Sequence, residues 1–432
     1  MALTADAVII GSGIVGASTA LELSRRGMKV IVVDKAGGPG FGSTSASSAV
    51  IRFNYSTWDG VVTAWESKFR WEKWEDHLGY RDPTGLAKFV RCGLAFLDVD
   101  MVPRERMTTM FDKAGIPYED WDAARLATAI PGIDAGKYFP PKAVTSEEFF
   151  ADAEGSLGAI FTPDAGYVDD PQLAAANLAR AAESYGASLM FNRTVTAIEQ
   201  RGADWQVVLD GREQIDTPIV VNAAGPWSTK INKLADVGGD FTIDVAPMRQ
   251  EVHHTPLPER LANLGAPIPV IADLDLGTYI RADSTHSLLV GGTEPDCDPL
   301  EWIDDPDAAD PRPSMERFES QVYRAARRLP ELSIPTRPRG IAGVYDAASD
   351  WTPIYDRTDK PGFYVAMGTS GNQFKNAPII GDLMATVIGD AEAGRETVPL
   401  TYVAPHTGHL IDLGAFSRKR EINKDSSGTV MG

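Results

Sequence analysis

The chain has 432 residues, of which 43% are hydrophobic and 23% charged, and its formal net charge is −19. This length predicts two or three domains, and the acidic surplus argues against nucleic-acid or anionic-membrane partners, whose negative charge would repel it. Only two cysteines are present, Cys92 and Cys297. We see neither a signal peptide nor a run of roughly 18 apolar residues, and therefore expect a cytoplasmic protein without a transmembrane helix.

The first predicted elements form a strand, turn, helix and strand between residues 6 and 35. A strand at 7–10 is followed by Gly11, Gly13 and Gly16, at the GxGxxG spacing of a dinucleotide-binding turn. These glycines permit the tight turn, the approach of a pyrophosphate and close helix packing, with the phosphates at the helix N-terminus. A helix at 14–26 and a strand at 29–33 follow, and Asp34 is placed to bind ribose hydroxyls. We predict a bound dinucleotide; the alternative is a glycine-rich turn without a ligand.

Serine and glycine dominate the next segment, 37–48, which we expect to run beside the cofactor. An apolar stretch at 49–55 carries the single charge of Arg52. The pattern then predicts helices at 61–78, as a pair within 112–129, and at 172–185; strands are predicted at 93–98, 188–191, 195–199, 205–209 and 219–221. The last of these strands enters NAAGPWS (222–228), whose small residues allow a second close approach to the cofactor.

Residues 247–294 are mostly of strand type and predict a large antiparallel sheet. An acidic, proline-rich stretch at 304–313 is expected to be a surface loop, before a helix at 315–329 and strands at 339–345 and 362–367. A glycine turn at 368–377 precedes a helix at 379–388, and we expect a polar tail from 391 on. His253 and His254 are neighbours on a strand and point to opposite faces, so no metal site is predicted.

The order of these motifs resembles the D-amino-acid-oxidase family of flavoproteins, and within it the sarcosine oxidase and dimethylglycine oxidoreductase branch. The resemblance covers roughly residues 5–390 and includes GSGIVG, GSTSASSAVIR, GYVDDP, VVNAAGPWS, SLLVGGTEP, YDAASDWTPIYD and GTSGNQFK. It implies an α/β fold in which a Rossmann-like FAD-binding domain adjoins an α+β substrate domain built on a large, mostly antiparallel sheet. The implied FAD-binding domain comprises 1–90, 161–236 and 335–390, the substrate domain 91–160 and 237–334, and the tail 391–432.

FAD is preferred to NAD, because an NAD enzyme needs only the first glycine motif and not the later ones. N–H groups of the 369–373 turn are expected to stabilise negative charge on the reduced flavin. The predicted FAD-binding residues are Gly11, Gly13, Ile14, Val15, Gly16, Asp34, Lys35, Gly42, Ser43, Thr44, Ser45, Val195, Ala223, Ala224, Gly225, Trp227, Gly343, Gly368, Ser370, Gly371, Asn372, Gln373, Phe374 and Lys375.

By similarity to monomeric sarcosine oxidases, Arg52 and Lys375 match the pair that holds the substrate carboxylate, and Tyr345 matches an active-site tyrosine. The physical reason is that an anionic amino acid above an apolar flavin needs its carboxylate paired. Two cations from distant segments would orient the C–H bond next to nitrogen toward flavin N5.

Several positions depart from the family pattern. Gly343 and Ala46 stand where relatives carry a cysteine or histidine bonded to FAD, so we predict non-covalent FAD. Leu289 replaces the lysine that activates oxygen in sarcosine oxidases, which makes a dehydrogenase plausible beside an oxidase. Thr293 aligns near the histidine of the sarcosine site, so the substrate need not be sarcosine. A folate-binding half is not expected, and a C1 product would leave as formaldehyde.

The favoured hypothesis is oxidation of a small secondary or N-methyl amino acid by hydride transfer to FAD, with hydrolysis of the imine to an aldehyde or keto acid plus amine. The electron acceptor is O₂ or an unknown carrier. Two alternatives stay open: an FAD-dependent 2-hydroxy-acid or polyol dehydrogenase, and a non-catalytic flavoprotein subunit of a larger complex. Hydrolase chemistry is not expected, because Ser228 and the serine loop lack a paired histidine and acid.

Overall fold

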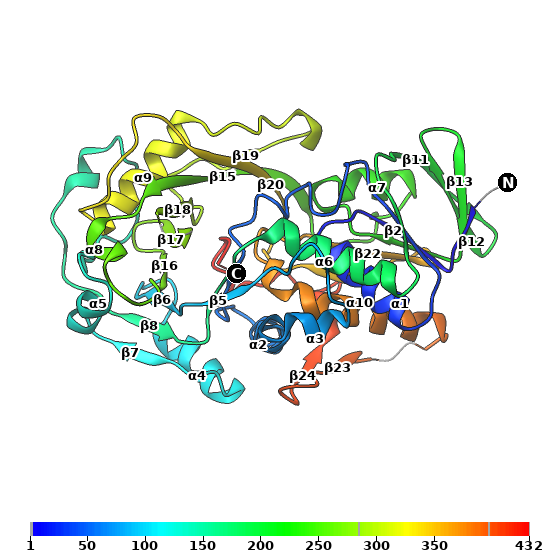
Figure 1. The fold of residues 1–432 in the computed structure, drawn as a ribbon, viewed down its shortest axis with the longest axis horizontal. Coiled ribbons are helices and arrows are strands. Elements are labelled where there is room, and N and C mark those ends of the chain that lie inside the picture. Colours follow the sequence, from blue (N-terminus) through cyan, green and yellow to red (C-terminus); the bar gives the residue numbers. More distant parts are fainter. Residues whose placement is uncertain (1–2, 284–285, 396–397, 432) are drawn as a thin grey trace.

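The computed structural model describes residues 3–283, 286–395 and 398–431. Two parts lie side by side in Figure 1, one around a parallel sheet and the other around a large, mostly antiparallel sheet. This arrangement confirms the α/β fold with an α+β second part that the sequence predicts.

The parallel sheet has the strand order β10–β3–β2–β14–β22–β21, and only the β21–β22 pair is antiparallel. Its strands are β2 (Ala7–Ile10), β3 (Val30–Val33), β10 (Ser188–Met190), β14 (Ile219–Asn222), β21 (Ile354–Arg357) and β22 (Phe363–Met367). Successive side chains alternate between its faces. Ala7 and Ile9 therefore join the hydrophobic core on one face, while Val8 and Ile10 join the core on the other.

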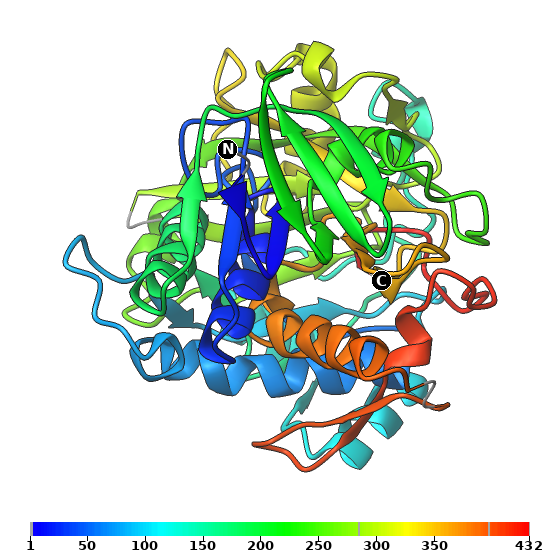
Figure 2. The same ribbon diagram turned by 90° about the vertical axis from the view of Figure 1, so that its right-hand side faces the viewer.

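Helices cover the first face and a second sheet covers the other. The three helices that pack together are α1 (Ile14–Arg25), α6 (Pro171–Ser184) and α10 (Ala377–Glu392), and Figure 2 shows α1 in blue beside α10 in orange. The covering sheet has the order β1 (Leu3–Thr4), β13 (Glu213–Thr217), β12 (Asp204–Leu209), β11 (Val195–Arg201). With both faces covered, β2, β3, β14 and β22 are buried along their whole length, which explains their continuous apolar sequences.

The large sheet forms the other part of the molecule. Its order is β19 (Glu301–Trp302), β15 (Val245–Pro256), β18 (Ser287–Gly292), β17 (Thr278–Asp283), β16 (Val270–Asp273), β6 (Leu94–Leu97), β8 (Ala159–Thr162), β7 (Glu119–Trp121), and β20 (Gly340–Ala348) also pairs with β15. All these pairs are antiparallel except β6–β16. The helix α9 (Met315–Arg328) packs on β15, β17 and β18. Because β20 lies in a segment assigned to the FAD-binding domain, this sheet crosses a predicted boundary; the boundaries stay predictions.

The remaining elements correct two predictions. The single helix expected at 61–78 is two, α2 (Trp58–Glu72) and α3 (Trp74–Leu78), because Lys73 between them leaves helical geometry. The helix pair expected within 112–129 is α4 (Arg104–Ala114), strand β7 and α5 (Ala123–Ala129); α4 ends at Gly115, whose φ of +71° ends the helix. Short elements complete the fold: β4 (Val50–Ile51), β5 (Phe89–Arg91), β9 (Gly166–Val168), α7 (Ser228–Leu234) and α8 (Glu259–Ala262).

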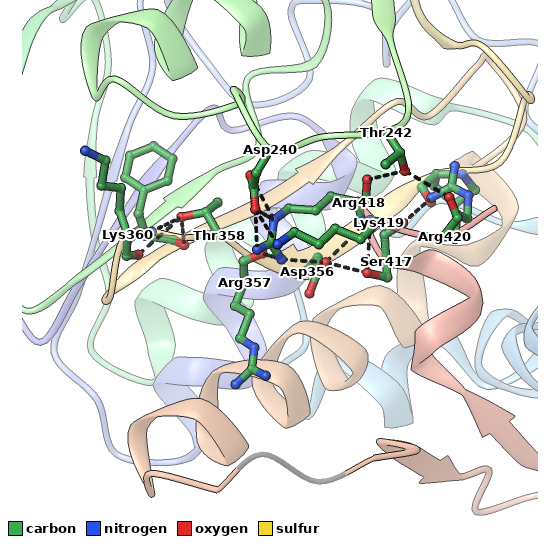
Figure 3. A network of polar contacts seen from close by, with 12 residues as sticks. Asp240, Thr242, Asp356, Arg357, Thr358, Lys360, Ser417, Arg418, Lys419 and Arg420 are labelled. Atoms are coloured by element: carbon green, nitrogen blue, oxygen red, sulfur yellow. Dashed lines mark hydrogen bonds and ion pairs between the residues drawn. The ribbon is translucent and has the colours of Figure 1, made fainter. Parts of the chain in front are cut away.

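The polar tail expected from residue 391 on, with few apolar anchors, packs against the rest of the protein. Residues 398–431, here called the C-terminal segment, include β23 (Thr401–Val403) and β24 (Leu410–Asp412) and bury Ile411, Leu413 and Phe416. Arg418 pairs with Asp240 at 2.8 Å and with Asp356 at 3.0 Å, as Figure 3 shows. The sequence did not predict this packing, because the segment has few apolar residues and much of its attachment comes from ion pairs with distant residues. The segment then runs back to the centre of the molecule (Figure 1).

Candidate active site

A cavity of ≈ 550 Å³ lies where the two parts of the molecule meet. Its walls come from the β2–α1 turn, the loop after residue 41, strand β20, the turn after β22 and the end of the C-terminal segment. These segments are far apart in sequence. The cavity has the size of a ligand-binding site, and its two ends differ in the kind of group that they present.

At one end, the β2–α1 turn has the geometry of a dinucleotide cradle. Gly11 has a φ of +105°, and a Cβ there would lie 2.4 Å from the carbonyl oxygen of Ala223. A Cβ on Gly16 would lie 2.0 Å from the Gly11 oxygen, so this glycine brings the helix against the strand. The Asp34 carboxylate lies at the cavity wall and accepts the backbone N–H of Ser12 at 2.6 Å. The cradle and the acid fit the pyrophosphate and ribose of FAD.

Most of the residues predicted to bind FAD line this cavity. They are Gly11, Gly13, Ile14, Val15, Asp34, Lys35, Gly42, Ser43, Thr44, Val195, Ala223, Ala224, Gly225, Trp227, Gly343, Gly371, Asn372, Gln373, Phe374 and Lys375. Gly16, Ser45, Gly368 and Ser370 are not in its wall. Of these, Ser370 lies behind the wall, where its hydroxyl donates to the Gly368 oxygen at 3.1 Å and accepts the N–H of Ala348 at 3.0 Å.

The acidic stretch expected to be a surface loop also reaches this end of the cavity. Asp307 forms an ion pair with Lys35 and accepts the indole N–H of Trp227 at 2.9 Å. The Lys35 ammonium lies 3.9 Å from the centre of the Trp227 ring. The three side chains therefore close the cavity wall beside Asp34, an arrangement for which the sequence carries no local signal.

At the other end, the structure brings Arg52 and Lys375 together beside Tyr55. Arg52 follows β4, and Lys375 lies in the turn that leads into α10. The guanidinium carbon of Arg52 lies 5.0 Å, and the ammonium nitrogen of Lys375 5.2 Å, from the centre of the Tyr55 ring. Lys375 donates to the Tyr55 hydroxyl at 3.1 Å and to the Asn372 oxygen at 2.6 Å. Sequence reasoning missed Tyr55; its place three residues after Arg52 is the available signal.

Both cations are buried and neither has an acidic partner in the described part of the chain. Each is only 4% exposed. Arg52 donates to backbone oxygens alone, those of Asn54 and, at 2.7 Å, Val430. Burial lowers the pKa of Arg52, while burial together with the Arg52 charge holds the pKa of Lys375 well below its usual value. Buried cations are normally paired. This end of the cavity is therefore suited to an anionic ligand.

Tyr345 lies on β20 and faces the same cavity. Its ring packs against Gly371, where an added Cβ would lie 2.2 Å from a ring carbon. Burial, together with nearby Tyr279 and Glu294, raises the pKa of Tyr345 well above its usual value, so the hydroxyl stays protonated. Gly371 is therefore needed for two reasons: its φ is +67°, and a side chain there would collide with the Tyr345 ring.

The positions that depart from the family pattern lie near this site. A Cβ on Gly343 would lie 2.8 Å from the Cβ of Ala46, so the two positions that depart from the flavin-linking pattern are adjacent. Leu289 is buried in a small cluster with Val252 and Tyr279. Thr293 is also buried, just beyond the end of β18.

Further residues at this end could not be recognised in the sequence. Val430 and Met431 of the C-terminal segment line the cavity, as does Tyr279 of β17. The Tyr279 hydroxyl shares a hydrogen bond of 2.5 Å with the Ser48 hydroxyl, which ties β17 to the serine loop. Glu294 is buried next to them and accepts the backbone N–H of Val430 at 2.7 Å.

The adjacent histidines of β15 lie in different surroundings. His253 is fully buried against the Phe318 ring, whereas His254 is partly exposed and lies 3.3 Å from Asp283. Within residues 3–283, 286–395 and 398–431, no group of three or more histidine, cysteine or acidic side chains is arranged to hold a metal ion. In the same residues, no helix combines the length and apolar character needed to span a membrane.

Comparison with known proteins decides the family. The FAD dependent oxidoreductase (DAO) family matches residues 6–387. The chain belongs to this family. It is 25% identical to glycine oxidase of Geobacillus kaustophilus (strain HTA426) over 94% of this chain and 98% of that protein. It is 24% identical to sarcosine oxidase subunit beta of Arthrobacter sp over 94% of this chain and 92% of that subunit. The cofactor prediction, FAD, and the resemblance stated from the motifs are confirmed.

Solved structures show the same fold. L-proline dehydrogenase from P. horikoshii superimposes with a TM-score of 0.73 at 24% identity, over 93% of this chain and 96% of that one. Glycine oxidase from Geobacillus kaustophilus superimposes with a TM-score of 0.71, over 98% of this chain and 100% of that one. The protein is an FAD-dependent oxidoreductase of mixed α/β architecture.

Proposed function

We propose that the substrate of this oxidoreductase is a small α-amino acid, preferably one with a secondary or N-methylated amine. The observation that carries the proposal is the pair of buried cations, Arg52 and Lys375, beside Tyr55 at one end of the cavity. A carboxylate of the substrate would supply the missing counter-charge. The relatives support this choice, because their names state activity on glycine, sarcosine and L-proline, all small amino acids.

In this proposal, the protein binds and orients the substrate. Arg52 donates to the carboxylate, and the ammonium of Lys375, which also lies beside Tyr55, is a second donor to it. Tyr345, held against Gly371, limits where the substrate side chain and nitrogen can lie. When bound, FAD accepts at N5 the hydride that leaves the carbon next to nitrogen. Water then hydrolyses the imine to an aldehyde or keto acid plus amine.

We further propose that FAD is held without a covalent bond and that oxygen is a poor electron acceptor. The adjacent positions 343 and 46 carry glycine and alanine, which have no atom able to form such a bond. At position 289 the buried Leu289 offers no positive charge to stabilise reduced oxygen.

The test is anaerobic reduction of the purified yellow protein with a panel of amino acids, followed by admission of air. We expect sarcosine, proline or a similar secondary amino acid to bleach the flavin absorbance, and the colour to return slowly. Acid precipitation should release all the flavin. Bleaching by a 2-hydroxy acid but not by its amino analogue would instead establish the hydroxy-acid alternative. A chain that stays oxidised with every donor until a partner subunit is added would establish the subunit alternative.

A further inference from the structure

One residue of the C-terminal segment, Val430, joins Arg52, which lines the cavity, to Glu294, which is buried behind the cavity wall. The N–H of Val430 donates to the Glu294 carboxylate at 2.7 Å, and the carbonyl oxygen of the same residue accepts from Arg52 at 2.7 Å. The atoms that span the two side chains are therefore N, Cα, C and O of a single residue. This is the skeleton of an α-amino acid, with Glu294 at its nitrogen and Arg52 at its carboxyl end.

Glu294 has the features of a ligand-binding acid. It is 9% exposed, and its Oε1 atom has no hydrogen-bond partner among the described residues. Its φ of +49° is unusual for a residue with a side chain, and such strain is concentrated at functional sites. In the described part of the chain, no cation forms an ion pair with it. An acid in this position is suited to a positively charged or N–H-bearing ligand.

We propose that Glu294 binds the nitrogen of the substrate while Arg52 binds its carboxylate. The spacing of the two side chains then selects ligands whose nitrogen and carboxylate are separated as in an α-amino acid. The inference rests on the proposed function and adds the residue that distinguishes an amino acid from other carboxylates. Val430 takes the place of the substrate in this structure and has to withdraw before a substrate binds. Arg418 and Arg420 anchor the segment further back (Figure 3) through ion pairs with Asp240 and Asp350, and these contacts need not break when Val430 withdraws.

In this assignment, Glu294 also accepts the proton that the substrate nitrogen must lose. An amino acid arrives with a protonated nitrogen, which has no lone pair to drive hydride loss. Ionised Glu294 would take one proton from it and leave a neutral amine. The lone pair of that amine can form the C=N bond as the C–H electron pair leaves with its hydrogen as hydride, for which bound FAD would supply the acceptor. The product is an iminium ion, and the proton stays on Glu294 until solvent enters.

The surroundings set the pH at which this acid can act. Burial raises the pKa of Glu294 to about 8, with the Val430 N–H and Arg317 opposing that rise. The phenols that face it belong to Tyr279 and Tyr345, whose pKa values are themselves raised, so both are uncharged in this range. Glu294 therefore becomes a proton acceptor as the pH rises through about 8.

The test compares Glu294→Gln with wild type, with Glu183→Gln on the exposed face of α6 as the control. Glutamine keeps the shape and loses the charge. We expect about a 100-fold loss in the anaerobic rate of flavin reduction by the amino acid at low concentration, and loss of the rise in rate around pH 8. Acetate, a carboxylate without nitrogen, should perturb the flavin spectrum with a Kd within about threefold of wild type. Arg52→Met should weaken acetate and amino acid alike.

Retention of wild-type reduction by Glu294→Gln, or equal weakening of acetate, would overturn the inference while leaving the proposed function standing. Failure of every amino acid to reduce wild type would overturn both. A second variant, lacking residues 424–432 but retaining Arg418 and Arg420, should bind the amino acid several-fold more tightly, because Val430 no longer competes. An unchanged Kd in that variant would show that Val430 and the substrate do not share a place.

Discussion

Two groups of buried cations in this protein have opposite surroundings. Arg328, at the end of α9, is fully buried and lies 2.7 Å from both Asp273 and Asp275. Its Nη1 also donates to the backbone oxygens of Asp134 and Gly136. Arg52 and Lys375 are almost as buried, yet they meet a tyrosine and backbone oxygens instead of carboxylates.

The difference separates a structural charge from one that we propose binds a ligand. A buried ion pair whose hydrogen bonds are satisfied keeps its geometry but cannot accept a further anion. A buried cation without a counter-ion destabilises the empty protein and gains most when an anion arrives. A carboxylate ligand would therefore explain why Arg52 and Lys375 are buried close together without acidic partners. The Arg328 cluster already contains its carboxylates and needs no ligand to explain it.

The largest effect is expected at the structural cluster. Arg328→Met should lower the free energy of unfolding by about 3–5 kcal/mol, because Asp273 and Asp275 would remain buried without their partner. Urea denaturation followed by circular dichroism measures the loss. Arg312→Met is the matched control: its side chain is 83% exposed, so its pair with Asp310 should contribute little to stability. Equal losses in the two variants would contradict the structural role of Arg328.

A variant at the cofactor end of the cavity provides an uncharged comparison. It should lose activity because FAD no longer binds, without any change in the buried charges. Gly11→Ala places a methyl group against the Ala223 oxygen and strains the backbone, so we expect about 3 kcal/mol of destabilisation and loss of bound FAD. Gly27→Ala is the control, because Gly27 also has a positive φ, +82°, but no atom lies within 4 Å of a Cβ added there. It should cost about 1 kcal/mol and keep its flavin. Flavin content and thermal melting measure both.

The ligand-binding charges should give a smaller effect, and one on affinity instead of stability. Arg52→Met should raise the Kd of the amino-acid substrate about 10- to 100-fold, the equivalent of one charged hydrogen bond. Its free energy of unfolding should be unchanged or higher, because an unpaired buried charge is removed. Titration followed by the flavin spectrum, beside urea denaturation, gives both quantities. A loss of stability like that of Arg328→Met would remove the distinction between the two groups.

The smallest effect is a pH dependence. The pKa of Lys375 is well below its usual value in the folded protein, so between that pKa and about 10.5 the unfolded chain binds more protons than the folded one. Stability of the substrate-free protein should therefore rise with pH across this window, by at most about 1.4 kcal/mol per pH unit. The slope should be shallower in Lys375→Met. Denaturation at several pH values measures it, and identical slopes in the two proteins would refute the shift.

The cofactor end of the cavity could be predicted largely from local sequence. Gly11 and Gly16 are needed because backbone atoms come too close for any side chain, and Asp34 follows the strand that positions it. Such requirements act over about 30 residues and leave a recognisable spacing. The packing of Asp307 on Lys35 and Trp227 left no comparable signal, since exposed acidic loops and loops that cover a ligand have similar compositions.

The end of the cavity that carries Arg52 and Lys375 was predicted in part. Arg52, Lys375 and Tyr345 came from the family resemblance, and the structure places all three at one cavity. Tyr55, Glu294 and Val430 were missed. Their chemistry depends on burial and on contacts with other segments. The residues next to them in the sequence predict neither.

By itself, the sequence determined the class of fold and the cofactor, because alternating burial, glycine spacing and strand length are consequences of local backbone geometry. The tertiary structure decided which cations have partners, and that the C-terminal segment returns to the cavity and places Val430 between Glu294 and Arg52. Electrostatic free energies depend on distance and on exclusion of water, and both are set only when segments hundreds of residues apart pack together.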